Sequence, residues 1–361
     1  MPPFRRAFAT FCVLAPLIYI YWRQFTTPGG LLIDATPERI FNKTLGFSKI
    51  FVINLPSRTD RRDAMVLAGA VSNLSFSWID GVTGDQVPDD IFPESDRGHS
   101  AGARGSWRSH MNALQTIVDK DLGSALILED DIDWDIRLKS QLQTFAAASR
   151  TWLRESQSSK SEVELLDTTI GAGGNVESVY GAAWDVLWLG HCGADLPKAQ
   201  KSLTSPLVVT ILEDETVPAP QHLKPHPFAL QDKLGKQYPP HTRVVHASSG
   251  NVCTLAYAVS QEGARKLLLD FNSRYDAQWD LMLQKWCEGT PPTCLTVQPP
   301  LFSHYYPKGG ASDIQGQGGG YAKGSGSPYI RLSVRENLGR LVTGEPFSQM
   351  VDQLPDDGEP I

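Results

Sequence analysis

The hydrophobic and polar positions along residues 48–131 predict strands separated by helices. Lys49–Leu55 and Ser75–Ile79 are short apolar runs bounded by turn residues, which is typical of strands. Between them, residues 59–71 have a helical pattern with Thr59 as the expected N-cap. A second predicted helix, after residue 102, has an apolar face made of Trp107, Met111, Leu114 and Val118. Because strands and helices alternate, we expect an α/β fold with a mainly parallel central sheet.

The third predicted strand ends in three consecutive acids, Glu129, Asp130 and Asp131. The apolar residues before them, Ala125–Leu128, are typical of a strand buried on both faces. Since side chains alternate along a strand, Glu129 and Asp131 should point to one side and Asp130 to the other. Open α/β sheets bind ligands at the carboxyl ends of their strands, and Mg²⁺ or Mn²⁺ would relieve the repulsion among these carboxylates. A solvated acidic turn is the alternative.

Three arginines crowd the start of the first predicted helix. Arg58, Arg61 and Arg62 lie where the helix dipole prefers anions. Cations at a helix N-terminus are locally unfavourable, and such unfavourable features are more frequent at functional sites. A bound nucleotide diphosphate would compensate the positive charge. The alternative is that Asp60 and Asp63 neutralise solvated arginines.

The second half of the chain continues with strands and helices. Apolar runs predict strands at 185–191 and 252–259, and a further apolar segment ends at His304. Ser260 is the expected cap of one helix, and Tyr275 opens another. The acidic run at 212–215 lacks a comparable strand–helix frame, so we assign it no metal. Residues 156–181 have the composition of an insertion or loop.

Composition limits the compartment and the partners. The chain has 361 residues, a formal net charge of -7 and a pI near 5.6, with no basic stripe, which argues against a nucleic-acid partner. One of its five cysteines, Cys12, lies in the N-terminal apolar run, and no pair of the others has metal-binding Cys-x-x-Cys spacing. Cys287 and Cys294 could close a small disulfide loop in an oxidising compartment, or remain free thiols. The other two are Cys192 and Cys253.

The N-terminus predicts a membrane anchor. Arg5 and Arg6 precede an uncharged run, Ala7–Trp22, that Arg23 closes. The run is short for a spanning helix, but no Ala-x-Ala-like site follows it, so we favour an uncleaved signal anchor over a cleaved signal peptide. With the positive residues inside, the body would lie in the lumen of the Golgi or endoplasmic reticulum as a single-pass type II protein. The predicted parts are a cytoplasmic tail (1–6), a transmembrane signal anchor (7–23), a stem (24–47), a catalytic domain (48–345) and a disordered acidic tail (346–361).

Several of these segments, in this order, resemble glycosyltransferase family 25, which includes bacterial lipooligosaccharide galactosyltransferases and animal procollagen galactosyltransferases. The resemblance covers about residues 48–335. It rests on Val52–Leu55 with Arg58 and Arg61, Ile79–Gly81, Gly105–His110, Leu128–Asp131, Asp185–Gly190, Tyr257–Ser260, Asp280 and Ser312–Ile314. The Ser106-Trp107-Arg108 variant, the insertion and the 197–242 connection are similar to fungal members and depart from the bacterial pattern. The acceptor and the sugar are therefore not carried over.

The resemblance implies a GT-A-like nucleotide-sugar-binding fold and an inverting transfer. The donor would be a UDP-sugar, with galactose or glucose as the hexose, and the acceptor a glycan or glycoprotein hydroxyl. Glu129 and Asp131, with His304 as a third ligand, would hold Mn²⁺ or Mg²⁺ at the donor diphosphate. The implied donor-binding residues are Asn54, Arg58, Arg61, Asp80, Ser109, His110 and Asp130. A core role for His110 and a surface position for His304 are the alternatives.

A single displacement needs a carboxylate that accepts the proton of the acceptor hydroxyl. Asp280 is the first candidate and Asp276 the second, and a solvated acid at a helix start is the alternative for Asp280. Two other functions compete with the transferase. A metal-dependent phosphohydrolase of the haloacid type needs an aspartate nucleophile on its first strand, where this chain has Asn54. A catalytically inactive lectin-like domain is disfavoured by the intact acids.

Overall fold

The computed structural model describes residues 39–88, 91, 100–156, 162–165, 178–197, 206–223, 234–272, 274–289, 293–307 and 326–358. The predicted cytoplasmic tail, the signal anchor, most of the stem and the Ser312–Ile314 segment lie outside these ranges. Within them, no helix combines the length and the apolar character needed to cross a membrane.

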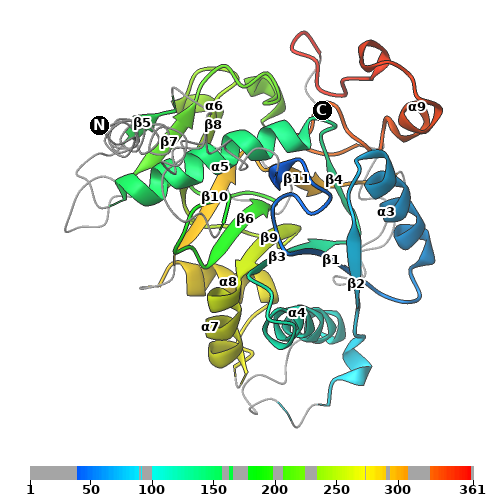
Figure 1. The fold of residues 1–361 in the computed structure, drawn as a ribbon, viewed down its shortest axis with the longest axis vertical. Helices are drawn as coiled ribbons and strands as arrows, with labels where there is room; N and C mark the ends of the chain where they lie inside the picture. Colours follow the sequence, from blue (N-terminus) through cyan, green and yellow to red (C-terminus); the bar gives the residue numbers. More distant parts are fainter. Residues whose placement is uncertain are drawn as a thin grey trace, which may run out of the picture.

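The described strands form one mixed sheet (Figure 1). They are β1 (Lys49–Asn54), β2 (Phe76–Asp80), β3 (Ser124–Glu129), β4 (Ile132–Trp134), β5 (Glu162–Glu164), β6 (Val186–Gly190), β7 (Val208–Ile211), β8 (Arg243–Ala247), β9 (Ala256–Ser260), β10 (Cys294–Gln298) and β11 (Phe302–His304). The strand order is β2-β1-β3-β9-β6-β10-β8-β7-β5, and β11 pairs with β4 and β6.

The predicted mainly parallel sheet is wrong. β1 runs parallel to β2 and β3, as the alternation of strands and helices indicated. However, β9 lies antiparallel between β3 and β6, and β8 is antiparallel to both β7 and β10. The β–α–β pattern therefore determines the direction of the first three strands only.

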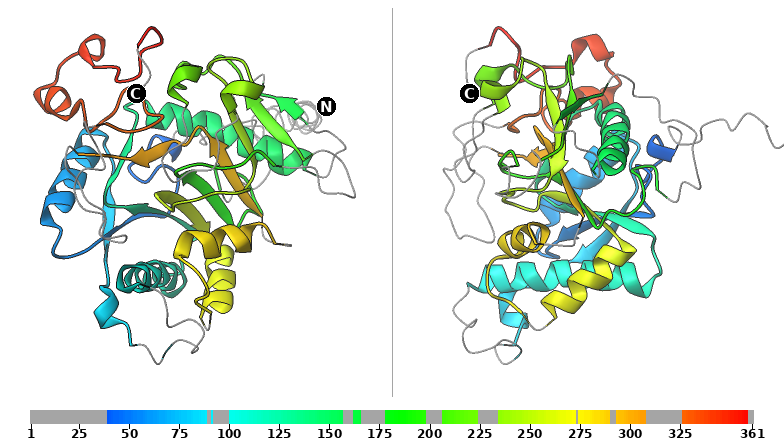
Figure 2. Two further views of the ribbon diagram at one scale, coloured as in Figure 1. Left: turned by 180° about the vertical axis from the view of Figure 1, so that it is seen from behind. Right: turned by 90° about the vertical axis from the view of Figure 1, so that its left-hand side faces the viewer.

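Helices cover both faces of the sheet (Figures 1 and 2). They are α3 (Thr59–Val71), α4 (Ala101–Asp119), α5 (Leu138–Glu155), α6 (Leu234–Gln237), α7 (Gln261–Phe271), α8 (Trp279–Cys287) and α9 (Leu338–Thr343). Alternate residues of each strand enter different cores. Ile50 and Val52 of β1 pack with α3 and α5, whereas Phe51 packs with α4, α7 and α8. This two-sided burial explains why the strands are continuous apolar runs.

Local signals were accurate to within a few residues. The Ser260 hydroxyl accepts a hydrogen bond from the Gly263 amide and caps α7, as predicted. At α3 the N-cap is Arg58, so Thr59 is the first helical residue and not the cap. On α4, Ile117 is fully buried in the place that the sequence pattern gave to Val118.

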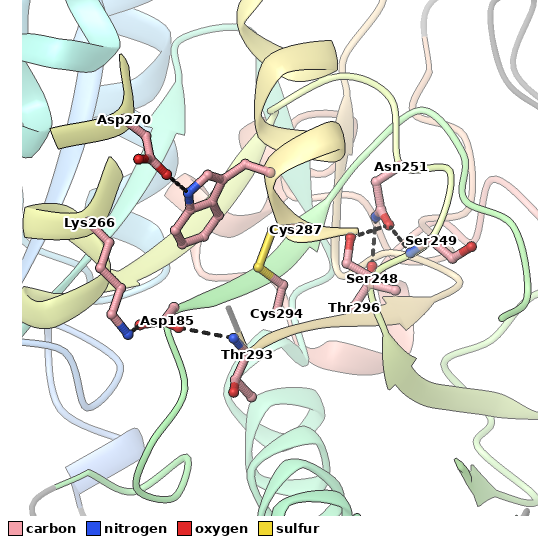
Figure 3. The surroundings of a disulfide bond; sticks show 11 residues. Asp185, Ser248, Ser249, Asn251, Lys266, Asp270, Cys287, Thr293, Cys294 and Thr296 are labelled. Carbon is pink, nitrogen blue, oxygen red and sulfur yellow. Dashed lines mark hydrogen bonds and ion pairs between the residues drawn. A yellow bond between two sulfur atoms is a disulfide. The ribbon is translucent and has the colours of Figure 1, made fainter. Parts of the chain in front are cut away.

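Two disulfides cross-link the described cysteines. Cys287, at the end of α8, bonds Cys294, at the start of β10, which is the disulfide alternative of the two that the sequence left open (Figure 3). Beside it, the Asp185 carboxylate accepts hydrogen bonds from the Lys266 ammonium at 2.9 Å and the Thr293 amide at 3.0 Å (Figure 3). The second disulfide joins Cys192 to Cys253 across 61 residues.

Both predicted ends of the catalytic domain need correction. Residues 39–47 were assigned to the stem, but Ile40 and Leu45 are fully buried in the main core. Residues 346–358 were expected to be a disordered tail, yet Leu354 is 2% exposed. The Gln353 amide also donates hydrogen bonds to the carbonyl oxygens of Ser327 and Ile330. The folded unit therefore extends beyond the predicted bounds at both ends.

Candidate active site

A cavity of about 660 Å³ lies at the carboxyl ends of β1, β2 and β3. Its wall also includes the first half of α4, the loop before β9, the start of α8, the segment after β11 and Arg335. Of the predicted site residues, it is lined by Arg58, Arg61, Ser109, His110, Glu129, Asp130, Asp131, Asp280 and His304. Asn54, Asp80 and Asp276 are not among the lining residues.

All three acids of the triplet line this cavity, which corrects the prediction that Asp130 points away from Glu129 and Asp131. β3 ends at Glu129, and the next two residues form a turn into β4. Side-chain alternation applies only inside a strand, so it does not place residues in this turn. We call Glu129, Asp130 and Asp131 the acidic turn.

Arg61 lies between two carboxylates of the acidic turn. Its Nη1 atom is 2.8 Å from Asp130 Oδ1 and 2.8 Å from Asp131 Oδ2. Asn54 Nδ2 donates to the other oxygen of Asp130 at 2.7 Å, so this carboxylate is held from both sides. Arg58 pairs with Asp60, and this pairing lowers the pKa of Asp60 to about 2. Arg58 and Arg61 are therefore held by different acids.

His304 and Asp131 form an ion pair in the cavity wall. His304 Nε2 lies 3.2 Å from Asp131 Oδ2. Burial is the largest single effect on each group and favours its neutral form, but the opposite charges nearby together outweigh it. His304 and Arg61 lower the pKa of Asp131, and Asp131 with Glu129 raises that of His304. The second oxygen, Asp131 Oδ1, is buried and accepts no hydrogen bond from the described residues.

The pKa of Glu129 is shifted in the opposite direction to that of Asp131. Burial, reinforced by the charge of Asp131, raises the pKa of Glu129 to about 8. The Thr254 hydroxyl donates a hydrogen bond to Glu129 Oε1 at 3.2 Å. A cation placed nearby would oppose this shift, because it favours the charged carboxylate.

The predicted ligands suit a divalent cation in their chemistry but are not gathered into a metal site. Glu129 and Asp131 offer oxygen donors, His304 a nitrogen, and the unpaired Asp131 Oδ1 is a buried acceptor. Across the described ranges, however, no three His, Cys, Asp or Glu side chains are close enough to hold a metal. Arg61 is bound to the Asp131 carboxylate, so a cation there has to share or displace it.

Ser109 and His110 shape the cavity while bonding to the protein. His110 Nδ1 lies 2.9 Å from the Tyr257 hydroxyl, and the ring stacks on Trp279 with centroids 4.9 Å apart. Burial lowers the pKa of His110 to about 3, so the ring is neutral. The Ser109 hydroxyl donates to the Gly105 carbonyl and accepts from the Val82 amide. These contacts agree with the core alternative for His110.

Asp280 lies in the first turn of α8 and lines the cavity. Its Oδ2 atom accepts a hydrogen bond from the Cys253 amide at 2.8 Å, and its Oδ1 atom accepts one from the Leu281 amide at 2.9 Å. Asp276 lies outside the cavity and pairs with Lys285 at 3.3 Å. Asp80 is exposed at the end of β2, in register with Asn54 on β1.

Sequence reasoning missed the contribution of the C-terminal segment, residues 326–337. Arg335 from this segment lines the cavity, next to Tyr305 and Tyr306, which follow β11. Asp133 and Asp135, which continue the acidic pattern after the turn, were a sequence signal that this region binds another segment of the chain. Both carboxylates are fully buried and accept hydrogen bonds from the C-terminal segment.

Comparison with known proteins confirms the resemblance over the first part of the chain. The sequence model of glycosyltransferase family 25 (LPS biosynthesis protein) matches residues 47–169. Procollagen galactosyltransferase 1-A of Xenopus laevis is 29% identical over 121 residues, which is 30% of this chain and 20% of the relative. Procollagen galactosyltransferase 2 of Homo sapiens is 28% identical over 111 residues, 27% of this chain and 18% of the relative.

The similarity does not separate active from inactive relatives. Inactive glycosyltransferase 25 family member 3 of Homo sapiens is 28% identical over 112 residues, 27% of this chain and 19% of the relative. The chain thus spans about a fifth of the length of these curated relatives. The matched segment contains the acidic turn and Arg61, whereas the motifs after residue 169, including Asp280, remain predictions from the sequence.

Proposed function

We propose that this protein is a glycosyltransferase that moves a hexose from a UDP-sugar to a hydroxyl group of a glycan or glycoprotein. The observation that carries the proposal is the acidic turn facing Arg61 in a cavity at the strand ends, inside the segment that matches family 25. Galactose is favoured over glucose as the sugar because the active relatives are named galactosyltransferases.

The cavity contains two kinds of group that a donor diphosphate site uses: arginines that bind phosphate oxygens, and side chains that can hold a metal ion. Arg58 and Arg61 supply guanidinium groups, which bind phosphate oxygens in pairs. Glu129, Asp131 and His304 would hold Mn²⁺ or Mg²⁺, which would neutralise charge on the departing diphosphate. Asn54 would act indirectly, because its amide holds Asp130 and Asp130 in turn holds Arg61.

Asp280 is the proposed base of an inverting displacement. The acceptor oxygen bonds to the anomeric carbon, the bond from this carbon to the diphosphate oxygen breaks, and the hydroxyl proton moves to the Asp280 carboxylate. Hydrogen bonds from two backbone amides fix the direction of this carboxylate. Nothing in this step requires a protein nucleophile.

The proposed compartment is the lumen of the Golgi or endoplasmic reticulum. The two disulfides support it, since such bonds persist in oxidising compartments. Anchoring by residues 7–23 stays a prediction from the sequence. A lectin-like, inactive domain is the second candidate, because some similar proteins are named as inactive or probable inactive members of the family.

The test is release of UDP from UDP-galactose and UDP-glucose by the full chain, with and without Mn²⁺. We expect metal-dependent release that Asp131→Asn abolishes, with the unfolding temperature showing that the variant is folded. Glu215→Gln, at an exposed position in the acidic run at 212–215, is the control and should retain activity. Unchanged release by Asp131→Asn would refute the donor-site assignment. UDP-sugar binding without release in the wild type would favour the lectin-like alternative.

A further inference from the structure

Arg335 reaches the cavity from far along the chain. It lies 205 residues after Asp130 and outside the segment that matches family 25. Its side chain nevertheless lines the same cavity as Arg58 and Arg61. The cavity therefore has three guanidinium groups from two distant parts of the sequence.

The Arg335 side chain is held in one orientation. Its Nε atom donates to the Ile132 carbonyl at 3.2 Å, and its Nη2 atom donates to the Asp130 carbonyl at 3.3 Å. The guanidinium carbon lies 5.4 Å from the centre of the Tyr305 ring. Neither hydrogen bond uses Nη1, and neither neutralises the charge, because both acceptors are carbonyl groups.

Buried acids fix the backbone that carries this arginine. Asp133 Oδ1 accepts a hydrogen bond from the Arg335 amide at 3.1 Å, and Asp133 Oδ2 accepts from the hydroxyls of Ser327 and Ser333. Asp135 Oδ2 accepts from the Leu332 amide at 3.0 Å. These two residues, in β4 and directly after it, therefore attach the C-terminal segment to the back of the acidic turn.

A diphosphate bound in this cavity would be stabilised by a third guanidinium group, whereas a neutral ligand would gain little from it. Arg61 is already shared between Asp130 and Asp131, and Arg58 is paired with Asp60. A polyanion placed beside the acidic turn would be repelled unless a further positive group faces it. Arginine is the side chain best suited to phosphate oxygens, and a fixed guanidinium loses little entropy on binding.

We propose that Arg335 binds the diphosphate of the nucleotide-sugar donor. This inference rests on the proposed function and adds a donor-binding residue to it. A purely structural role, in which Arg335 only holds the carbonyl groups of the acidic turn, is the competing explanation, and it makes a different prediction for ligands that lack phosphate.

The experiment measures binding of UDP, pyrophosphate and uridine to the full chain by calorimetry, for the wild type, Arg335→Lys and Arg335→Ala. We expect Arg335→Ala to weaken UDP and pyrophosphate at least tenfold and to leave uridine unchanged, with Arg335→Lys between. Arg331→Ala is the matched control. Arg331 lies in the same segment and pairs with Asp352 outside the cavity, so its loss should leave all three affinities unchanged.

Different failures have different meanings. Equal weakening of UDP and uridine by Arg335→Ala, or an equal effect of Arg331→Ala, would assign Arg335 a structural role and overturn the inference. Full UDP release by Arg335→Ala at wild-type UDP affinity would overturn it while the proposed function stands. Pyrophosphate binding that depends on Arg335, in a protein that neither binds uridine nor releases UDP, would support the anion site and refute the glycosyltransferase. A wild type that binds none of the three probes would overturn both.

Discussion

Asp280 is held by two backbone amides, and this fixed carboxylate makes its catalytic role testable. Replacing it with Asn removes the proton acceptor but keeps the size of the side chain. We expect Asp280→Asn to lower kcat about 10²- to 10⁴-fold, the range for loss of a general base, with little change in UDP affinity. Single-turnover kinetics with a saturating donor would measure this.

Asp276→Asn is the comparison, because Asp276 precedes the same helix but pairs with Lys285 outside the cavity. Its kcat should stay within about twofold of the wild type, as for a surface ion pair of little energetic consequence. A larger loss in Asp276→Asn than in Asp280→Asn would transfer the role of base to Asp276. Weakened UDP binding in Asp280→Asn would place Asp280 in the donor site.

Buried histidines make the stability of this protein sensitive to acid. Burial lowers the pKa of His191 to about 4 and that of His246 to about 4. Between pH 6.5 and 4 the unfolded chain therefore binds more protons at these positions than the folded chain does. The free energy of unfolding falls as the pH falls through this window, by up to about 1.4 kcal/mol per pH unit for each histidine.

The slope of the unfolding free energy against pH reports how many more protons the unfolded chain binds. This number should be smaller by up to one in His191→Gln and by up to two in the double variant with His246→Gln. Urea titrations at half-unit pH intervals would give the slopes. His191 follows β6 and His246 lies in β8, with β10 between these strands. Because the charge of His246 also lowers the pKa of His191, the double variant shows whether the two titrate independently. Parallel stability curves for wild type and variants would mean that these histidines are already accessible to protons in the folded protein.

At this scale the sequence predicted which acids matter but not where they point. Three consecutive acids after a buried strand are unusual enough to find, and Arg61 stood out because it opposes a helix dipole. The direction of Asp130 depends on a turn, which alternation does not describe. Arg335 had no local signal, because its importance comes from contacts that are 203 to 205 residues away in sequence.

The Cys192–Cys253 disulfide is the covalent link in the cavity wall. Both cysteines line the cavity, the Cys253 amide bonds Asp280, and the next residue, Thr254, bonds Glu129. We therefore expect the double variant Cys192→Ser with Cys253→Ser to lose activity at temperatures where it is still folded. Its stability should fall by up to about 4 kcal/mol in the chain-entropy account. Activity and unfolding temperature would be measured on the same samples.

The Cys287–Cys294 disulfide is the matched control, since it lies outside the cavity lining and closes a loop of 7 residues (Figure 3). Removing it should cost about 2 kcal/mol of stability and leave kcat near the wild-type value. Equal losses of activity in the two double variants would show that the first disulfide acts through global stability and not by positioning Asp280.

Elements with a strong period were predictable, and those that depend on distant partners were not. α3, α4 and β3 follow directly from apolar spacing. β9 was expected to begin at residue 252 and begins at Ala256, because residues 252–255 instead carry the disulfide and the contact of Thr254 with Glu129. Its antiparallel direction is set by pairing with β3 and β6, which its own sequence does not encode.

In the molecule as a whole, the acidic segment after β3 joins two distant parts of the chain. Its first three acids face the cavity, whereas Asp133 and Asp135 bind the C-terminal segment behind it. A buried carboxylate without donors is strongly unfavourable, so the C-terminal segment is needed to satisfy both of them. Composition predicted a disordered tail at 346–361, but Asp352 and Gln353 of that tail bind Arg331 and Ser327 in the C-terminal segment.

The end of the folded unit gives the last prediction. A chain that stops at residue 345 loses Leu354, the hydrogen bonds between the Asn337 side chain and the Val351 backbone, and the Arg331–Asp352 ion pair, whereas one that stops at 358 keeps them. We expect the shorter chain to be less stable by several kcal/mol, since a buried leucine alone contributes about 2 kcal/mol. The shorter chain keeps Arg335 but loses the Val351 and Gln353 contacts that hold Asn337 and Ser327 in the segment around it, so UDP affinity should fall as well. Equal unfolding temperatures for chains ending at 345 and 358 would show that residues 346–358 contribute nothing to the fold.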